Sequence, residues 1–191
     1  MTVEVYDMTK AIREAARAIA LERVKLCETW DRKNYFDTYS DLERNWQGCI
    51  AEVYLRQIYP MFELGQPLVV EGGQIAECDY IYRDKGIELK CNRFQKKKMW
   101  NYFLKNVGEH SYKGYTAEIL ICTGIDGPPP TASTFWIFGW ISMGDVEKCD
   151  IWKPGPDSNV RSPAYAIPRD QLKPLSELFY GGDFRLSQFL K

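Results

Sequence analysis

In two neighbouring segments of the sequence, apolar or aromatic residues alternate with charged ones. The segments are QIAECDYIY, residues 74–82, and GIELKC, residues 86–91. In a β-strand, successive side chains point to opposite faces, so a period of two predicts strands with one apolar and one charged face. Asp79 lies on the charged face of the first segment, and Glu88 and Lys90 lie on the charged face of the second.

The residues between the two segments predict a hairpin. Arg83-Asp84-Lys85-Gly86 is a turn sequence, and its glycine can adopt a positive φ. If these four residues form the loop, Lys90 lies directly across from Asp79. Glu88 is then a diagonal neighbour of Asp79 on the same face, about 7–8 Å away at Cα. A slip of one residue would place the two carboxylates on opposite faces.

The remaining chain predicts one domain over residues 1–191 that mixes helices and strands. We expect helices at 9–29 and 48–59, strands at 67–73, 115–124 and 135–143, a basic helix at 93–107, and a C-terminal strand and helix at 164–180. This order indicates an α/β (α+β) fold with a mixed central β-sheet flanked by helices.

Positive charge is concentrated near the predicted hairpin. The chain carries a net charge of −1, but residues 83–105 hold eight Lys and Arg against two acidic residues. Such a local excess is typical of phosphate contacts, which do not depend on base sequence. The residues that we expect to bind nucleic acid lie on the predicted basic helix: Arg93, Gln95, Lys96, Lys97 and Lys98, with Trp100 beside them. The alternative is an ordinary solvated helix face.

The charged face of the hairpin has the groups that metal-assisted phosphodiester hydrolysis needs. Carboxylates such as those of Asp79 and Glu88 are hard oxygen ligands, which suit Mg²⁺ or Mn²⁺. A bound cation of this kind can activate water and stabilise the departing oxygen. Lys90 could orient or deprotonate that water, and the backbone carbonyl of Leu89 could supply a further ligand.

This pattern resembles the PD-(D/E)XK, or restriction-endonuclease-like, nuclease superfamily over roughly residues 45–125. The resemblance implies that Asp79 and Glu88 bind the metal and that Lys90 is the catalytic lysine. It also implies that Glu52, on the helix before the sheet, completes the metal or water shell. Cys78 stands where the family name has proline. The function expected from the resemblance is a Mg²⁺-dependent deoxyribonuclease.

Simpler interpretations exist for each of these residues. The paired charges of the hairpin could form a solvated cross-strand ion pair. Glu52 has the spacing of a surface ion pair with Arg56, and Glu77 could be a strand-edge charge. At the level of the whole chain, the alternatives are a nucleic-acid-binding module of the same fold that has lost cleavage, and an unrelated α/β structural or interaction protein.

The sequence also indicates the setting of the protein. Charges run through residues 1–25, which argues against a signal peptide, and no segment predicts a membrane span. The six cysteines include no C-x-x-C pair, so we expect reduced thiols in a cytoplasmic protein. A small domain that cuts both strands of DNA normally acts as a homodimer. The sequence is compatible with duplex, branched or single-stranded DNA and with RNA as the substrate, and with one or two metal ions in the site. It is also compatible with roles in restriction, recombination, repair or phage DNA processing.

Overall fold

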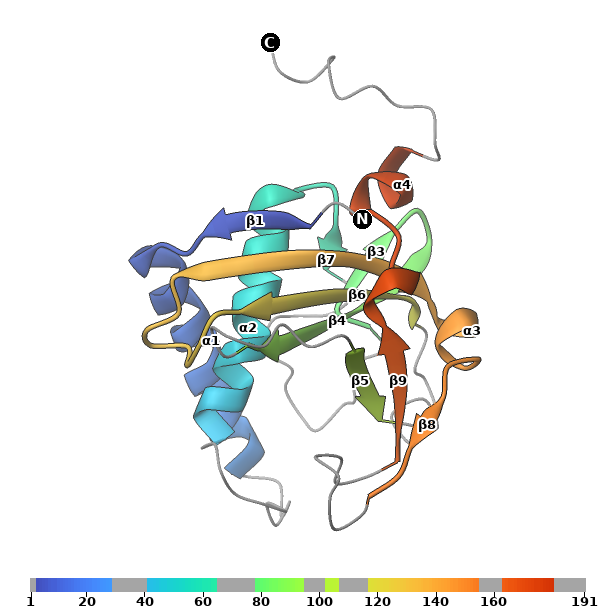
Figure 1. Cartoon of the computed structure of the whole chain (residues 1–191). Coiled ribbons are helices and arrows are strands. Elements are labelled where there is room, and N and C mark those ends of the chain that lie inside the picture. The colour runs from blue at the N-terminus through green and yellow to red at the C-terminus, as the bar shows by residue number, and fades with distance from the viewer. Residues whose placement is uncertain are drawn as a thin grey trace.

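The structure is a computed structural model that describes residues 3–28, 41–64, 78–94, 102–106, 117–154 and 163–180. Its main element is a six-stranded mixed sheet with the strand order β1-β7-β6-β4-β3-β2 (Figure 1). The strands of this sheet are, in chain order, β1 (Glu4–Asp7), β2 (Glu63–Leu64), β3 (Tyr80–Tyr82), β4 (Lys85–Arg93), β6 (Ala117–Ile125) and β7 (Thr134–Ser142). Strands β4 and β6 are parallel, and the other neighbours are antiparallel.

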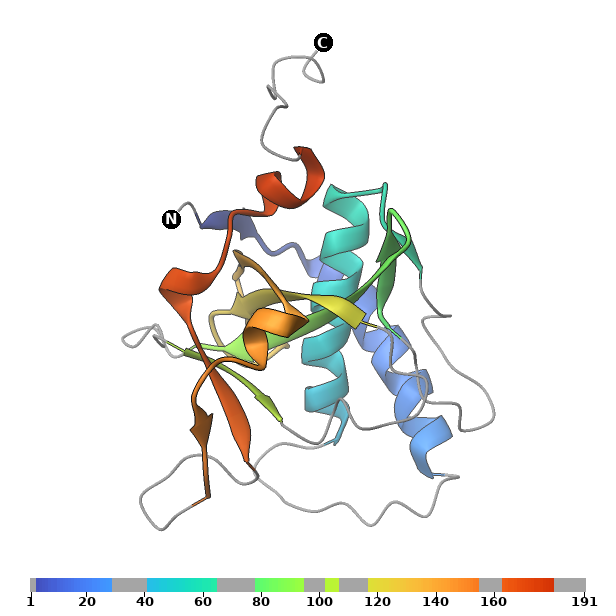
Figure 2. The ribbon, with the colours of Figure 1, turned by 90° about the vertical axis from the view of Figure 1, so that its right-hand side faces the viewer.

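The sheet is covered on both faces. Helices α1 (Lys10–Glu28) and α2 (Asp41–Ile58) lie on one face. A three-stranded sheet of β5 (Tyr102–Asn106), β9 (Ala164–Pro168) and β8 (Ile151–Trp152) lies on the other, as Figure 2 shows. Short helices α3 (Met143–Val146), η2 (Arg169–Gln171) and α4 (Leu175–Tyr180) complete the described fold. The predicted mixture of helices with a mixed sheet is therefore confirmed.

The apolar core has two parts, one on each side of the larger sheet. Strand β6 runs through the middle and is buried on both faces, which explains its almost continuous apolar sequence. Ile119 and Ile121 pack with the helices, whereas Leu120 and Cys122 pack toward the smaller sheet. The charged residues of β4 lie within this three-layer arrangement.

Most of the predicted elements are present, with shifted boundaries. The first helix is confirmed, and Ile12, Ala16 and Ala20 form its buried stripe. The second helix begins at Asp41, seven residues earlier than predicted, and ends before Pro60. The strands predicted at 86–91, 115–124 and 135–143 are confirmed as β4, β6 and β7, and the C-terminal strand and helix as β9 and α4.

Some predicted segments lie outside the described residues, and some observed strands were missed. The strand predicted at 67–73 is not among the described residues, nor are residues 74–77 of the first alternating segment. The short strands β1, β2 and β8 were not predicted. They have two to four residues each, which is too short for a period to be recognised.

The prediction of a basic helix over 93–107 is wrong where the structure describes that segment. Arg93 is the last residue of β4, and Tyr102–Asn106 forms β5, which pairs with β9. Phe103 and Lys105 are both buried, as the alternation of a strand requires. Pairing with the distant strand β9 overrides the helical preference of the local sequence. Residues 95–101, including Gln95, Lys96, Lys97 and Lys98, lie outside the described residues.

The predicted hairpin is present, but its loop is shorter than expected. Tyr82 pairs with Lys85, so the turn consists of Arg83 and Asp84, with φ values of 50° and 62°. Two consecutive positive φ values are typical of the two-residue turn that matches the twist of a hairpin. Gly86, the residue expected to supply the positive φ, instead lies within β4 and pairs with Ile81.

Candidate active site

The shorter loop changes the neighbours of Asp79. Tyr80 pairs with Ile87 and not with Leu89, a shift of two residues from the predicted register, and Asp79 stands immediately before β3. The predicted pairing of Asp79 with Lys90 is therefore wrong. The N–H of Asp79 donates to the carbonyl of Ile87 at 2.9 Å, and the Oδ2 of Asp79 accepts from the N–H of Leu89 at 2.6 Å. These two bonds tie the backbone and side chain of Asp79 to β4.

Glu88 and Lys90 share one face of β4, as predicted. They pair with Leu120 and Cys122 of the parallel strand β6, whose side chains face the smaller sheet. From that sheet, Lys105 of β5 reaches Glu88, with 2.8 Å between its Nζ and Oε1 of Glu88. The side chain of Lys105 is only 1% exposed and that of Glu88 is 20% exposed, so this is an interior ion pair.

Glu52 approaches the hairpin from α2. The guanidinium of Arg23, on α1, donates to both carboxylate oxygens of Glu52, at 2.7 and 2.6 Å. Glu52 is buried, and its backbone carbonyl accepts a hydrogen bond from the hydroxyl of Tyr80 at 2.6 Å. The simpler interpretation, a surface pair of Glu52 with Arg56, does not hold, because Glu52 is buried and forms a bidentate pair with Arg23.

The acids affect one another electrostatically. Burial raises the pKa of Asp79 to about 8, and the negative charges of Glu88 and Glu52 add to this effect. The hydrogen bond from Leu89 and the charge of Arg23 act in the opposite direction. Near neutral pH, the structure therefore favours a proton on Asp79, or another positive charge that takes its place.

Arg23 and Lys105 are the residues of this cluster that the sequence analysis missed. Arg23 continues the buried stripe of α1 by three residues beyond Ala20, and Lys105 follows buried Phe103 by two residues in a strand. When the helical or strand periodicity places a charged residue among buried positions, that residue is expected to form a buried ion pair. For Lys105, the incorrect helix prediction concealed that signal.

The donor set fits a divalent metal in its chemistry. Asp79, Glu88 and Glu52 provide hard carboxylate oxygens, and a bound cation would offset the burial and the negative charges that raise the pKa of Asp79. Within the described residues, no group of three or more His, Cys, Asp or Glu side chains is gathered closely enough to hold an ion. Glu52 and Glu88 are instead turned to Arg23 and Lys105.

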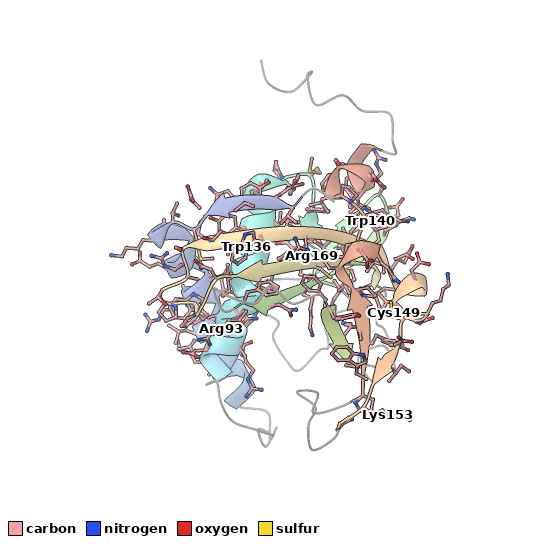
Figure 3. The ribbon with its side chains drawn as sticks, in the orientation of Figure 1. Arg93, Trp136, Trp140, Cys149, Lys153 and Arg169 are labelled. Atoms are coloured by element: carbon pink, nitrogen blue, oxygen red, sulfur yellow. The ribbon has the colours of Figure 1, made fainter. Side chains whose placement is uncertain are left out.

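Of the predicted nucleic-acid-binding residues, only Arg93 lies in a described segment. It stands at the end of β4 beside α2, where its Nη1 is 3.9 Å from Oε2 of Glu43 (Figure 3). Lys90, three residues earlier, is half-buried, and its carbonyl accepts from the hydroxyl of Thr123 at 3.1 Å. Arg93 and Lys90 therefore follow the same strand from the acids toward the end of β4.

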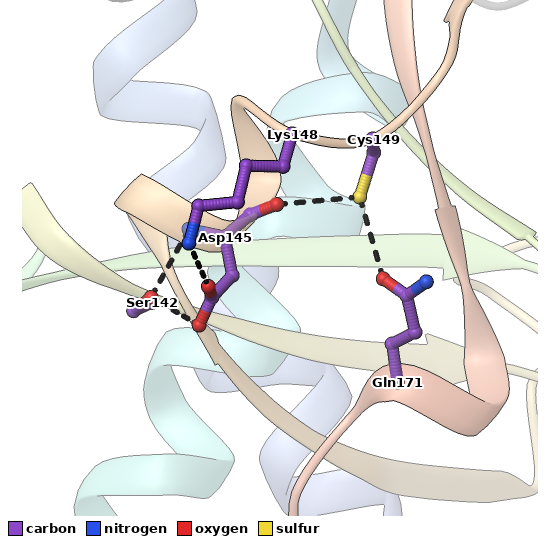
Figure 4. Close-up of polar contacts among 5 residues, drawn as sticks. All are labelled: Ser142, Asp145, Lys148, Cys149 and Gln171. Atoms are coloured by element: carbon purple, nitrogen blue, oxygen red, sulfur yellow. Dashed lines mark hydrogen bonds and ion pairs between the residues drawn. The ribbon is translucent and has the colours of Figure 1, made fainter.

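The described cysteines do not form a second reactive centre. Cys49, Cys78, Cys91, Cys122 and Cys149 are free thiols. Burial raises the pKa of Cys49 and of Cys91 to about 12, which keeps both thiols protonated at neutral pH. Cys149 lies near the surface, where its Sγ is 3.5 Å from the carbonyl of Asp145 (Figure 4).

No family model, curated protein or solved structure matches this chain. Among the helices that the structure describes, none is long and apolar enough to cross a membrane.

Proposed function

We propose that the protein is a divalent-metal-dependent endonuclease of the PD-(D/E)XK type that hydrolyses phosphodiester bonds of DNA. The observation that carries the proposal is the crowding of acids at the β3–β4 hairpin. Burial, together with the charges of Glu88 and Glu52, raises the pKa of Asp79, which is itself fixed to β4 by the N–H of Leu89. A protein that holds several acids against one another in this way usually does so for function, because the arrangement costs stability.

In this proposal, Asp79 and Glu88 hold Mg²⁺ or Mn²⁺, with Glu52 and the carbonyl of Leu89 as auxiliary groups. The metal, when bound, supplies a positive charge that activates water and stabilises the departing oxygen. Lys90 lies two residues after Glu88 on the same face of β4 and orients or deprotonates the attacking water. Because Arg23 binds both oxygens of Glu52, Glu52 is an auxiliary group and not a primary ligand of the metal.

The fold is compatible with this proposal. A hairpin of β3 and β4 carries the acids, α2 precedes it with Glu52, and β6 continues the sheet in parallel with β4. A helix, a hairpin and a mixed sheet in this order support the resemblance over about residues 45–125, although the described part of the expected basic helix is strand β5. We propose on this basis that the fold is restriction-endonuclease-like.

DNA is the proposed substrate because of the charge distribution. Eight Lys and Arg against two acids in residues 83–105 favour phosphate contacts beside the site. One of the eight, Lys105, is buried and therefore does not contribute to such a surface. The proposed contacts are Arg93, Gln95, Lys96, Lys97 and Lys98. Cleavage of both strands of a duplex would require a homodimer. The proposed role is DNA processing in the cytoplasm.

One observation favours a second candidate, a nucleic-acid-binding module of the same fold without cleavage. Lys105 and Arg23 neutralise Glu88 and Glu52 within the chain itself. Acids that serve only as partners of buried cations would give the same ion pairs. The two candidates differ in whether a metal ion is bound and used.

The experiment is cleavage of supercoiled plasmid and of a branched oligonucleotide with Mg²⁺ or Mn²⁺. The wild type is compared with Asp79→Ala and Lys90→Ala, and Glu118→Gln, which changes an exposed acid on β6, is the matched control. We expect metal-dependent nicking by the wild type and the control, and a loss of at least 100-fold in both site variants. Salt-sensitive DNA binding without any cleavage would support the binding module instead.

A further inference from the structure

Lys105 has an environment that is unusual for a lysine. Its side chain is 1% exposed, and it lies on the inner face of β5, two residues after the fully buried Phe103. Burying an ammonium group is costly unless it is paired with an opposite charge and hydrogen-bonded. The carboxylate of Glu88, 2.8 Å away, provides that partner.

This pair differs from the ion pairs on the surface. Lys148 and Asp145 also lie 2.8 Å apart, but their side chains are 76% and 42% exposed (Figure 4). An exposed pair of that kind is weak and exchanges with solvent. The Lys105–Glu88 pair is instead fixed by two strands, because β5 is paired with β9 over five residues and β4 with β6 over eight.

The Lys105 ammonium therefore stands where it competes with a metal ion. Glu88 presents Oε1 to Lys105, and Asp79 is hydrogen-bonded to Ile87 and Leu89, the residues on either side of Glu88. A cation that binds between Asp79 and Glu88 must share Glu88 with Lys105 or displace it. An ammonium group and a divalent cation a few ångströms apart repel each other, which weakens metal binding by about tenfold or more even where solvent screens the charges.

We propose that Lys105 is an internal counter-cation that holds Glu88 in place in the metal-free protein and yields it to the divalent ion. This inference rests on the proposed function, since it assumes that Asp79 and Glu88 bind the metal. Lys105 is thus a positioning residue that sets metal affinity. It keeps the acid ordered without metal, at the cost of weaker metal binding.

The test is the affinity for Mn²⁺, measured by calorimetry on the full chain at low salt without DNA. The variants are Lys105→Met and Lys105→Gln, and the control is Lys148→Met, which removes an exposed lysine from an ordinary surface pair. We expect Mn²⁺ to bind both Lys105 variants about tenfold more tightly than the wild type, and the control to match the wild type. A residue that merely supports the fold would give the opposite direction, because a disturbed site binds metal less well.

The outcomes separate the two proposals. If the wild type binds Mn²⁺ and the Lys105 variants bind it equally or more weakly, this inference is overturned while the nuclease proposal stands. If none of the proteins binds Mn²⁺, both are overturned. Lys105→Gln retains a donor for Glu88 in case Lys105→Met does not fold. The wild type alone gives a further check by NMR: saturation with Mg²⁺ must shift the Nζ resonance of Lys105, and an unchanged resonance contradicts the inference.

Discussion

Replacing Asp79 by Asn should stabilise the metal-free protein at alkaline pH while it removes the proposed metal site. The folded protein raises the pKa of Asp79 from its ordinary value of 3.8 to about 8, through burial and the charges of Glu88 and Glu52. Between these two values, the folded chain keeps a proton that the unfolded chain releases. The stability of the wild type must therefore fall as pH rises through this window.

The magnitude follows from the width of that window. The difference between 3.8 and about 8, at about 1.4 kcal/mol per pH unit, gives an upper limit of about 6 kcal/mol. Asp79 is partly exposed to water, which screens its repulsion from Glu88, and Asn forms a weaker hydrogen bond with the N–H of Leu89. We therefore expect a net gain of about 2–3 kcal/mol above pH 8 and almost none at pH 4.

The assay is urea unfolding with a chelator present at pH 4, 6 and 8.5, for the wild type, Asp79→Asn and Glu118→Gln. The control changes an acid whose side chain is 58% exposed, and its effect should stay within about 0.5 kcal/mol at every pH. A variant whose stability relative to the wild type does not increase with pH would refute the reasoning. It would mean that neither burial nor the charges of Glu88 and Glu52 raise the pKa of Asp79 in the folded protein.

Two further predictions concern the framework of the site. Gly139→Ala should lower the free energy of unfolding by about 3 kcal/mol, measured in urea. Gly139 has a φ of 136°, and a Cβ there would lie 2.3 Å from the carbonyl oxygen of Lys173. A change below about 1 kcal/mol would contradict this clash. Tyr80→Phe should lower the free energy of unfolding by about 1–2 kcal/mol, measured by calorimetric melting. The reason is the loss of the 2.6 Å hydrogen bond that the Tyr80 hydroxyl donates to the buried backbone carbonyl of Glu52. An unchanged melting temperature would show that water replaces the hydroxyl.

Local patterns were sufficient for much of the sheet. The alternation in β4 and the apolar runs of β6 and β7 are properties of short segments, and these three predicted strands are confirmed. The same alternation placed Glu88 and Lys90 on one face. The register of the hairpin was less accessible, because it depends on whether Arg83 and Asp84 alone adopt positive φ values. An even shift of two residues preserved the faces but removed the predicted pairing of Asp79 with Lys90.

The identity of β5 shows where local information misleads. Its sequence, YFLKN, follows a run of lysines without Gly or Pro and suits a helix as well as a strand. Pairing with β9, more than fifty residues later in the chain, decides for the strand. That decision turns Lys105 from an expected surface charge into a buried partner of Glu88.

The sequence by itself determined which residues are candidates for chemistry: the acids Asp79, Glu88 and Glu52 and the lysine Lys90, each on a charged face or helix. Only the tertiary structure decided what charge each acid meets. The partners of Glu52 and Glu88 lie 29 and 17 residues away along the chain, on α1 and β5. Periodicity reports the direction of a side chain relative to its own segment, whereas an ion pair depends on how two segments pack.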